Sequence, residues 1–87
     1  MFDANYLNLI IFHMTVEYLR DAQRRQPFVP FFIHMADGRR VTVPHPDFIS
    51  MHPTGRLVFI WTEEGGSYIL DRTLMTSIEY PESPSDS

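Results

Sequence analysis

Hydrophobic and polar side chains alternate most regularly over residues 28–43, on both sides of an Asp-Gly pair. This alternation around a turn signal is typical of a β-hairpin. A three-residue loop, Ala36-Asp37-Gly38, would form a type I turn with Gly38 left-handed and opening a β-bulge. It gathers the apolar side chains of both strands on one face. The register then pairs Phe31 with Val43, Ile33 with Val41, and Met35 with Arg39.

A two-residue loop at Asp37-Gly38 is the alternative. It would pair Ile33 with Thr42 and His34 with Val41, which mixes polar and apolar side chains on both faces. Because a slip of one residue moves every side chain to the other face, the pattern favours the three-residue loop. The face opposite the core then carries Phe32, His34, Arg40 and Thr42.

A short helix is predicted before the hairpin. Apolar side chains recur at helical spacing from Val16, and Thr15 is a suitable N-cap. The helix should end near Gln26, because the residue before Pro27 disfavours the helical conformation.

Several short strands are predicted after the hairpin, over residues 48–51, 57–61 and 67–70. Residues 57–61 are apolar at every position, which indicates a central strand covered on both faces. A tight helical turn at residues 71–73 should precede a last strand. In that strand we expect Leu74, Thr76, Ile78 and Tyr80 to share a face.

One N-terminal helix followed by five or six short antiparallel strands predicts a mainly β (α+β) fold, a small barrel. We expect one domain over residues 14–80, because 87 residues hide too little surface for more. Met14 and Thr15 form a second natural beginning, so residues 1–13 are interpreted as an optional N-terminal extension. Residues 81–87 have nothing to bury and are expected to be a disordered tail.

Composition excludes several classes of site. The chain has no Cys and no Lys, so thiolate metal sites, Cys nucleophiles, Schiff-base chemistry and the P-loop lysine are absent. Between Met14 and Tyr80, seven Arg face eight carboxylates. A folded part so close to neutral exerts no general attraction on nucleic acid or anionic lipid.

The apolar segment over residues 6–14 is the only candidate targeting sequence. No basic region precedes it, no cleavage site follows it, and it is far shorter than the roughly 20 apolar residues that span a bilayer. We therefore expect no membrane association and a cytoplasmic location.

His45, Asp47 and His52, with His34 nearby, are the best candidates for a metal site, because imidazole and carboxylate suit Zn or Ni. Their spacing matches no compact ligand motif. The favoured interpretation is that these loop residues form turns and protect a strand edge. No cofactor is expected. The acidic pair Glu63-Glu64 is interpreted as a solvated hairpin tip.

An interaction surface is the other candidate site. Arg39, Arg40 and Arg56 can approach one another at one end of the barrel, with Phe32 and His34 beside Arg40 as stacking partners. Arginine beside aromatic side chains suits nucleic acid and also occurs at protein contacts. A merely solvated arginine cluster is the commonest alternative.

Four segments resemble a family of short, uncharacterised bacterial proteins. They are Met-Thr-Val-Glu-Tyr-Leu-Arg at 14–20, Gln-Pro-Phe-Val-Pro-Phe at 26–31, Ala-Asp-Gly-Arg at 36–39 and Val-Pro-His-Pro-Asp-Phe at 43–48. The resemblance extends from Met14 to about Tyr80. It implies Met14 as the usual start and implies no activity.

The chain is also similar to Sm-like proteins such as bacterial Hfq, in which a helix precedes a strand, an Asp-Gly or Asn-Gly turn and a second strand. Residues 68–72 and 74–78 are similar to the tight turn and final strand of that fold. Sm-like proteins form rings through sheet edges and bind RNA in pore loops, and Arg72 is the one position where a nucleic-acid contact carries over. The chain departs from that pattern in two ways. Its Pro-rich segment 44–53 is longer, and the usual bending Gly and loop Asn are missing.

The sequence therefore favours a non-catalytic interaction module that self-associates through edge strands or the N-terminal segment. A monomer of this size usually exposes less apolar surface than is expected here. The apolar groups expected to be exposed are Phe32 on the non-core face, residues 6–12 and the barrel edges. We expect a homo-oligomer, with a different protein as a further partner. The alternative is an Sm-like RNA-binding protein.

Overall fold

The computed structural model describes residues 14–81, which are mainly β with one helix. The helix α2 (Val16–Arg24) comes first. Two short 3-10 helices, η1 (Pro46–Phe48) and η2 (Arg72–Leu74), precede β3 and β6. The expected extension over residues 1–13 and residues 82–87 of the expected tail 81–87 lie outside the described residues. The six strands are β1 (Phe31–Met35), β2 (Arg40–Val43), β3 (Ile49–Met51), β4 (Leu57–Trp61), β5 (Ser67–Asp71) and β6 (Met75–Glu79).

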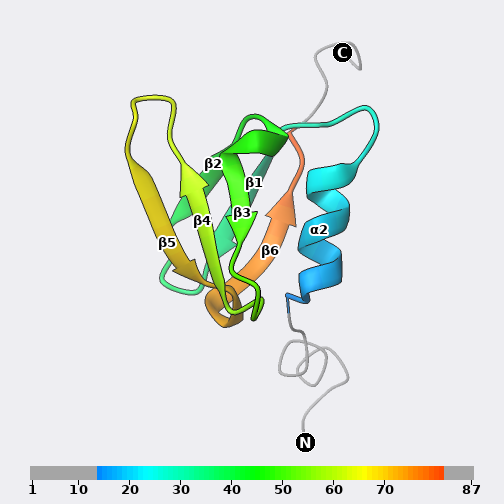
Figure 1. Ribbon diagram of the computed structural model, residues 1–87. Coiled ribbons are helices and arrows are strands. Elements are labelled where there is room, and N and C mark those ends of the chain that lie inside the picture. The colour runs from blue at the N-terminus through cyan, green and yellow to red at the C-terminus, as the bar shows by residue number, and fades with distance from the viewer. Residues whose placement is uncertain (1–13, 82–87) are drawn as a thin grey trace, which may run out of the picture.

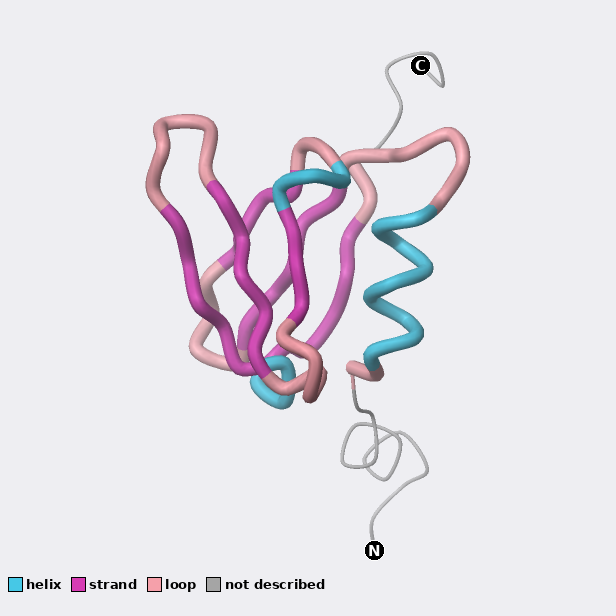
Figure 2. Tube along the Cα trace, viewed as in Figure 1, coloured by secondary structure: helices cyan, strands magenta, loops and turns pink. Residues whose placement is uncertain are grey.

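The strands form two antiparallel three-stranded sheets, in the orders β2-β1-β6 and β3-β4-β5. Figure 1 shows the two sheets facing each other as layers, and the chain crosses between them through η1 at one end and η2 at the other (Figures 1 and 2). A mainly β fold with one helix is thus confirmed. Within residues 14–81 no strand pairing joins the two sheets, so the expected closed barrel is not formed there.

The hairpin over residues 28–43 has the predicted register. Phe31 pairs with Val43 and Ile33 with Val41, and the Met35 N–H donates to the Arg39 carbonyl over 2.9 Å. Gly38 has a φ of 93°, the left-handed conformation that the three-residue loop requires. The alternating pattern therefore predicted both the turn and the buried face.

The core lies between the inner faces of the two sheets and under α2. Every fully buried side chain of the described residues is apolar. Its largest members are Phe31, Met14, Leu19, Ile33, Ile49, Ile60, Val43 and Val58.

The prediction that β4 is covered on both faces is wrong. β4 is the central strand of its sheet, but only Val58 and Ile60 are buried. Leu57 and Trp61 are exposed, because the opposite sheet covers one side of β4 and nothing in the described chain covers the other. The unbroken apolar run identified the strand, but without alternation it did not indicate which face is buried.

The predicted phase of the last strand is also wrong at its beginning. Leu74 ends η2 and is exposed, whereas Met75 begins β6 and is buried. The pairing of β1 with β6 shifts register between His34 and Met35, so Met75 and Ile78 both face the core. A β-bulge of this kind resets the alternation on which the expectation rested.

Helix α2 closes one side of the sandwich, between β3 and β6 (Figure 1). The Gln23 side chain donates to the carbonyls of Pro46 (3.0 Å) and Ile49 (2.8 Å), and the Arg25 guanidinium lies 4.8 Å from the centre of the Tyr80 ring. We call this the helix side. The opposite side, between the edges of β2 and β5, is called the open side.

The helix begins where the sequence predicted. The Thr15 hydroxyl accepts a hydrogen bond from the Tyr18 N–H over 3.0 Å, which is a standard N-cap. Leu19 and Ala22 are its buried side chains. At the start of the helix, Val16 packs so closely on Gly55 that an added Cβ there would lie 2.6 Å from a Val16 methyl carbon.

Candidate functional site

The outer face of the β2-β1-β6 sheet carries the predicted pair Phe32 and Arg40. The Arg40 guanidinium lies 4.3 Å from the centre of the Phe32 ring, a cation–π contact. Arg40 itself is exposed. The structure therefore brings these two residues together on the surface, as the hairpin register requires.

His34 lies on the same outer face. Its Nε2 is 2.7 Å from a carboxylate oxygen of Glu79 on β6. The contact links the two strands diagonally, because Glu79 is opposite Phe32 in the ladder. The polar side chains on this face therefore contact one another within the sheet.

Arg39 is engaged at the hairpin turn. The Asp37 carboxylate accepts hydrogen bonds from the Arg39 backbone N–H (3.0 Å) and from its Nε (2.8 Å). The backbone hydrogen bond is the main reason why the pKa of Asp37 lies below its ordinary value. The charge of Arg39 is therefore offset inside its own turn.

Arg56 is engaged at the end of β5, where its Nη2 lies 3.0 Å from an Asp71 oxygen. The other Asp71 oxygen accepts from the Thr73 hydroxyl (2.6 Å) and the Thr73 N–H (2.9 Å). The Thr73 hydroxyl contributes most, followed by Arg56, to lowering the pKa of Asp71 to about 2. Asp71 thus holds η2 and the turn before β4 together.

Arg72 points into the structure. Its guanidinium donates to the carbonyls of Gly55 and Met14, which ties η2 to the turn before β4 and to the residue before the α2 N-cap. This structural tie was not anticipated, because Met14, Gly55 and Arg72 are far apart in the sequence. The nucleic-acid contact inferred for Arg72 stays a prediction.

The predicted arginine cluster is only loosely assembled. Figure 1 shows the turn between β1 and β2 and the turn between β3 and β4 at the end of the molecule that holds η2. Arg39 and Arg56 therefore share one end, but each faces its own carboxylate, Asp37 or Asp71. The local charges nearly cancel, as the composition suggested.

The candidate metal ligands are not brought together. The His45 ring packs on Phe48, with ring centres 5.3 Å apart, and the His52 Nδ1 is 3.0 Å from the Thr54 hydroxyl. The part of the chain that the structure describes contains no group of three His, Asp or Glu side chains that could hold a metal ion. These residues instead organise the turns around β3.

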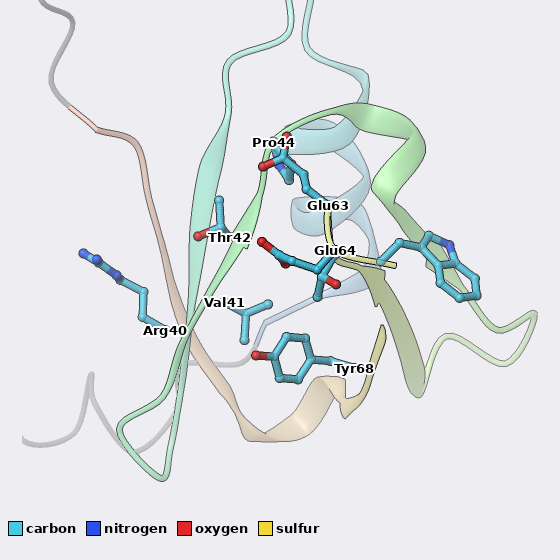
Figure 3. Close-up of a pocket in the computed structure, with 9 residues that line it drawn as sticks. Arg40, Val41, Thr42, Pro44, Glu63, Glu64 and Tyr68 are labelled. Carbon is cyan, nitrogen blue, oxygen red and sulfur yellow. The ribbon is translucent and has the colours of Figure 1, made fainter. Parts of the chain in front are cut away.

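A cleft of about 260 Å³ lies on the open side. Figure 3 shows Tyr68 and Val41 inside it, Glu63 and Glu64 at the hairpin tip above them, and Arg40 pointing away. Its polar groups come from exposed strand and turn positions, and it pairs no nucleophile with a base. Its lining residues are Arg40, Val41, Thr42, Pro44, Trp61, Thr62, Glu63, Glu64 and Tyr68.

The outer face of the β3-β4-β5 sheet is apolar. Leu57, Phe59 and Trp61 alternate along β4, and Ile69 lies directly opposite Phe59 on β5. The exposed fractions are 38% for Leu57, 47% for Trp61 and 67% for Ile69. We call these four residues the outer patch. Sequence reasoning missed it, although the unbroken apolar run of β4 was its signal.

Comparison with known proteins gives no match to a protein family, a curated protein or a solved structure. Within residues 14–81, the helices are too short and too polar to cross a membrane.

Proposed function

We propose that the protein is a non-catalytic interaction module that binds a second copy of itself through the outer patch. The observation that carries this proposal is the contrast between its two outer faces. One holds Phe32 under Arg40 and His34 beside Glu79, whereas the other exposes aliphatic and aromatic side chains across two strands. Contiguous exposed apolar surface of this kind marks an interaction site.

A second copy is the partner that fits the chemistry of the patch. Its four side chains carry no charge, and Asp71, which lies opposite Leu57 in the ladder, is engaged by Arg56. A strongly acidic or basic partner would find nothing to pair with there. Another outer patch supplies matching Leu, Phe, Trp and Ile side chains, and Trp and Phe are typical anchors of such interfaces.

We propose a non-catalytic role because the polar groups with perturbed pKa values are engaged in structural contacts. The carboxylates with lowered pKa, Asp37 and Asp71, stabilise turns through contacts with their own neighbours. The cleft on the open side is lined by threonines, glutamates and a tyrosine without a base–nucleophile pair.

The mass of the full chain in solution tests the proposal. At tens of micromolar, light scattering should give at least twice the 10.2 kDa of one chain. Ile69→Glu should return the mass to one chain, because it places a carboxylate in the patch. Ser77→Glu, on the exposed outer face of the other sheet, is the matched control and should leave the mass unchanged. A wild-type protein of one chain's mass contradicts self-association.

An Sm-like RNA-binding protein is the second candidate, and two observations favour it. Arg40 is exposed on the Phe32 ring, so a cation and an aromatic side chain lie together on the surface. The tight turn η2 leads directly into the last strand β6, which is the order of elements on which the resemblance to Sm-like proteins is based.

Fluorescence anisotropy with mixed single-stranded RNA tests this second candidate. Binding at low salt that weakens as salt rises, and weakens again in Arg40→Ala, is the expected result. Arg24→Ala, an exposed arginine on α2, is the control. No salt-sensitive binding at low salt contradicts the RNA-binding function.

A further inference from the structure

The free edge of β5 has a definite set of unpaired backbone groups. The Thr62 N–H donates to the Gly66 carbonyl, and the Arg72 N–H donates to the Arg56 carbonyl, at the two ends of the ladder between β4 and β5. Hydrogen-bonded pairs alternate along an antiparallel ladder. Tyr68 and Leu70 therefore bond to β4.

The N–H and C=O groups of Ser67, Ile69 and Asp71 consequently point away from β4. They form a row of three unpaired residues along one exposed strand, with Ile69 at its centre. Such a row is a template for pairing with another strand.

The other three edges are guarded. Pro44, which has no N–H, ends the short edge of β2, and the Gln23 side chain occupies the Ile49 carbonyl on the edge of β3. Helix α2 runs beside β6 in Figure 1, and its C-cap residue Arg25 lies over the Tyr80 ring. The edge of β5 has no Pro, no bulge and no covering element among the described residues.

We propose that two copies of the chain join by antiparallel pairing of β5 with β5, about a two-fold axis at Ile69. This inference rests on the proposed self-association and adds to it a strand-edge contact, which lies beside the outer patch and leaves the β4 side chains of the patch uncovered. Ile69 then faces Ile69 of the second copy, and Ser67 faces Asp71. All three are outward-pointing residues, so each pair is a hydrogen-bonded pair.

The pairing is consistent with charge and burial. No two like charges face each other, because the one ionised residue of the strand, Asp71, meets a Ser67 hydroxyl. The result is one six-stranded sheet in which the two outer patches lie next to each other. Ile69, the most exposed large apolar side chain described, becomes the centre of the interface.

Disulfide trapping tests the register, and the absence of any native Cys makes the test clean. Ile69→Cys should form a covalent dimer on oxidation, because paired residues in this register have Cα atoms about 5.5 Å apart, within disulfide range. Ser67→Cys is the matched control. Its two copies would lie four residues apart along the strands, about 14 Å, and should not cross-link.

Blocking the edge provides an independent test that leaves the outer patch intact. Ser67→Pro removes an N–H that points away from β4, so the hairpin keeps its ladder. We expect the dimer dissociation constant to rise by about tenfold or more, because both symmetry-related donors are lost. Thr42→Pro makes the same change on the edge of β2, where the N–H also points outward, and should leave the constant unchanged. Thermal unfolding at low concentration verifies that both variants fold.

The outcomes separate this inference from the proposed function. A wild-type chain that stays monomeric removes both. A wild-type dimer with no Ile69→Cys cross-link, or with equal cross-linking at Ser67→Cys, overturns the β5 pairing and leaves self-association standing. An odd number of copies also overturns it, because a two-fold pairing of one edge joins the chains in pairs.

Discussion

The helix side and the open side of the sandwich differ in how the edges of the two sheets are covered. On the helix side, the Gln23 side chain donates to the carbonyls of Pro46 and Ile49, Arg25 covers Tyr80, and Leu19 is fully buried in the core. On the open side, the short edge of β2 ends at Pro44, whereas the edge of β5 is left unpaired beside a cleft. Substitutions on the helix side should therefore change the stability of each chain, whereas substitutions along β5 on the open side should change association.

The largest effect should come from Leu19→Ala on the helix side. Leu19 is fully buried, so its truncation removes apolar contacts and leaves a cavity. We expect the free energy of unfolding to fall by about 2–5 kcal/mol, as for other buried Leu residues. Chemical denaturation at low protein concentration measures it. Ile69→Ala on the open side is the comparison and should cost under about 0.5 kcal/mol, and an equal loss would remove the distinction.

The next largest effect is expected at Gly55, where the turn before β4 meets α2. Gly55 has a φ of 80°, and an added Cβ would lie 2.6 Å from a Val16 side-chain carbon. Gly55→Ala should therefore lower the free energy of unfolding by about 1–3 kcal/mol. Gly38→Ala has the same backbone strain with open space around it, and should cost less. Equal costs at both positions would contradict the close packing of α2 on this turn.

A smaller loss is expected from Gln23→Ala. The change leaves the carbonyls of Pro46 and Ile49 without their side-chain donor, which should cost about 1–2 kcal/mol of unfolding free energy. Gln26→Ala, an exposed position after the helix, is the control and should be near neutral. No difference between the two variants would mean that α2 does not guard the edge of β3.

The smallest effect is the acid dependence contributed by Asp71. Its pKa is lowered to about 2 in the folded chain, mainly by the Thr73 hydroxyl and Arg56. A carboxyl group with a lowered pKa stabilises the fold above its ordinary pKa, and this stabilisation is lost as the pH falls toward the folded-state value.

Asp71→Asn should therefore flatten the decline of stability between about pH 4 and pH 2, measured by thermal unfolding at each pH. Asp47→Asn, at an exposed carboxylate in η1, is the control and should retain the decline. An unchanged profile in Asp71→Asn would show that the Thr73 and Arg56 contacts contribute nothing to stability.

The sequence predicted the parts of the fold in which only one arrangement hides the apolar side chains. Ile33 and Val41 share a buried face in just one hairpin register, and Thr15 begins a helix by local hydrogen bonding. The exposed face of β4 could not be predicted, because Leu57, Phe59 and Trp61 are as apolar as their buried neighbours. Only the position of the second sheet decides which residues face inward.

The candidate site was predicted where the hairpin register decides it, because the register puts Phe32 and Arg40 on one face. The contact of Arg39 with Asp37, two residues away, was not predicted. Arg56 with Asp71, and Arg72 with Met14, depend on how distant turns meet at one end of the molecule. No spacing in the sequence indicates such contacts.

Hydrogen exchange along β5, measured as a function of protein concentration, tests the central claim most directly. The amides of Tyr68 and Leu70 bond within the hairpin and serve as internal references. If a second copy completes this edge, the amide of Ile69 should exchange quickly at low concentration and become strongly protected at tens of micromolar. Rapid exchange of Ile69 at every concentration, with Tyr68 and Leu70 protected, would contradict the account.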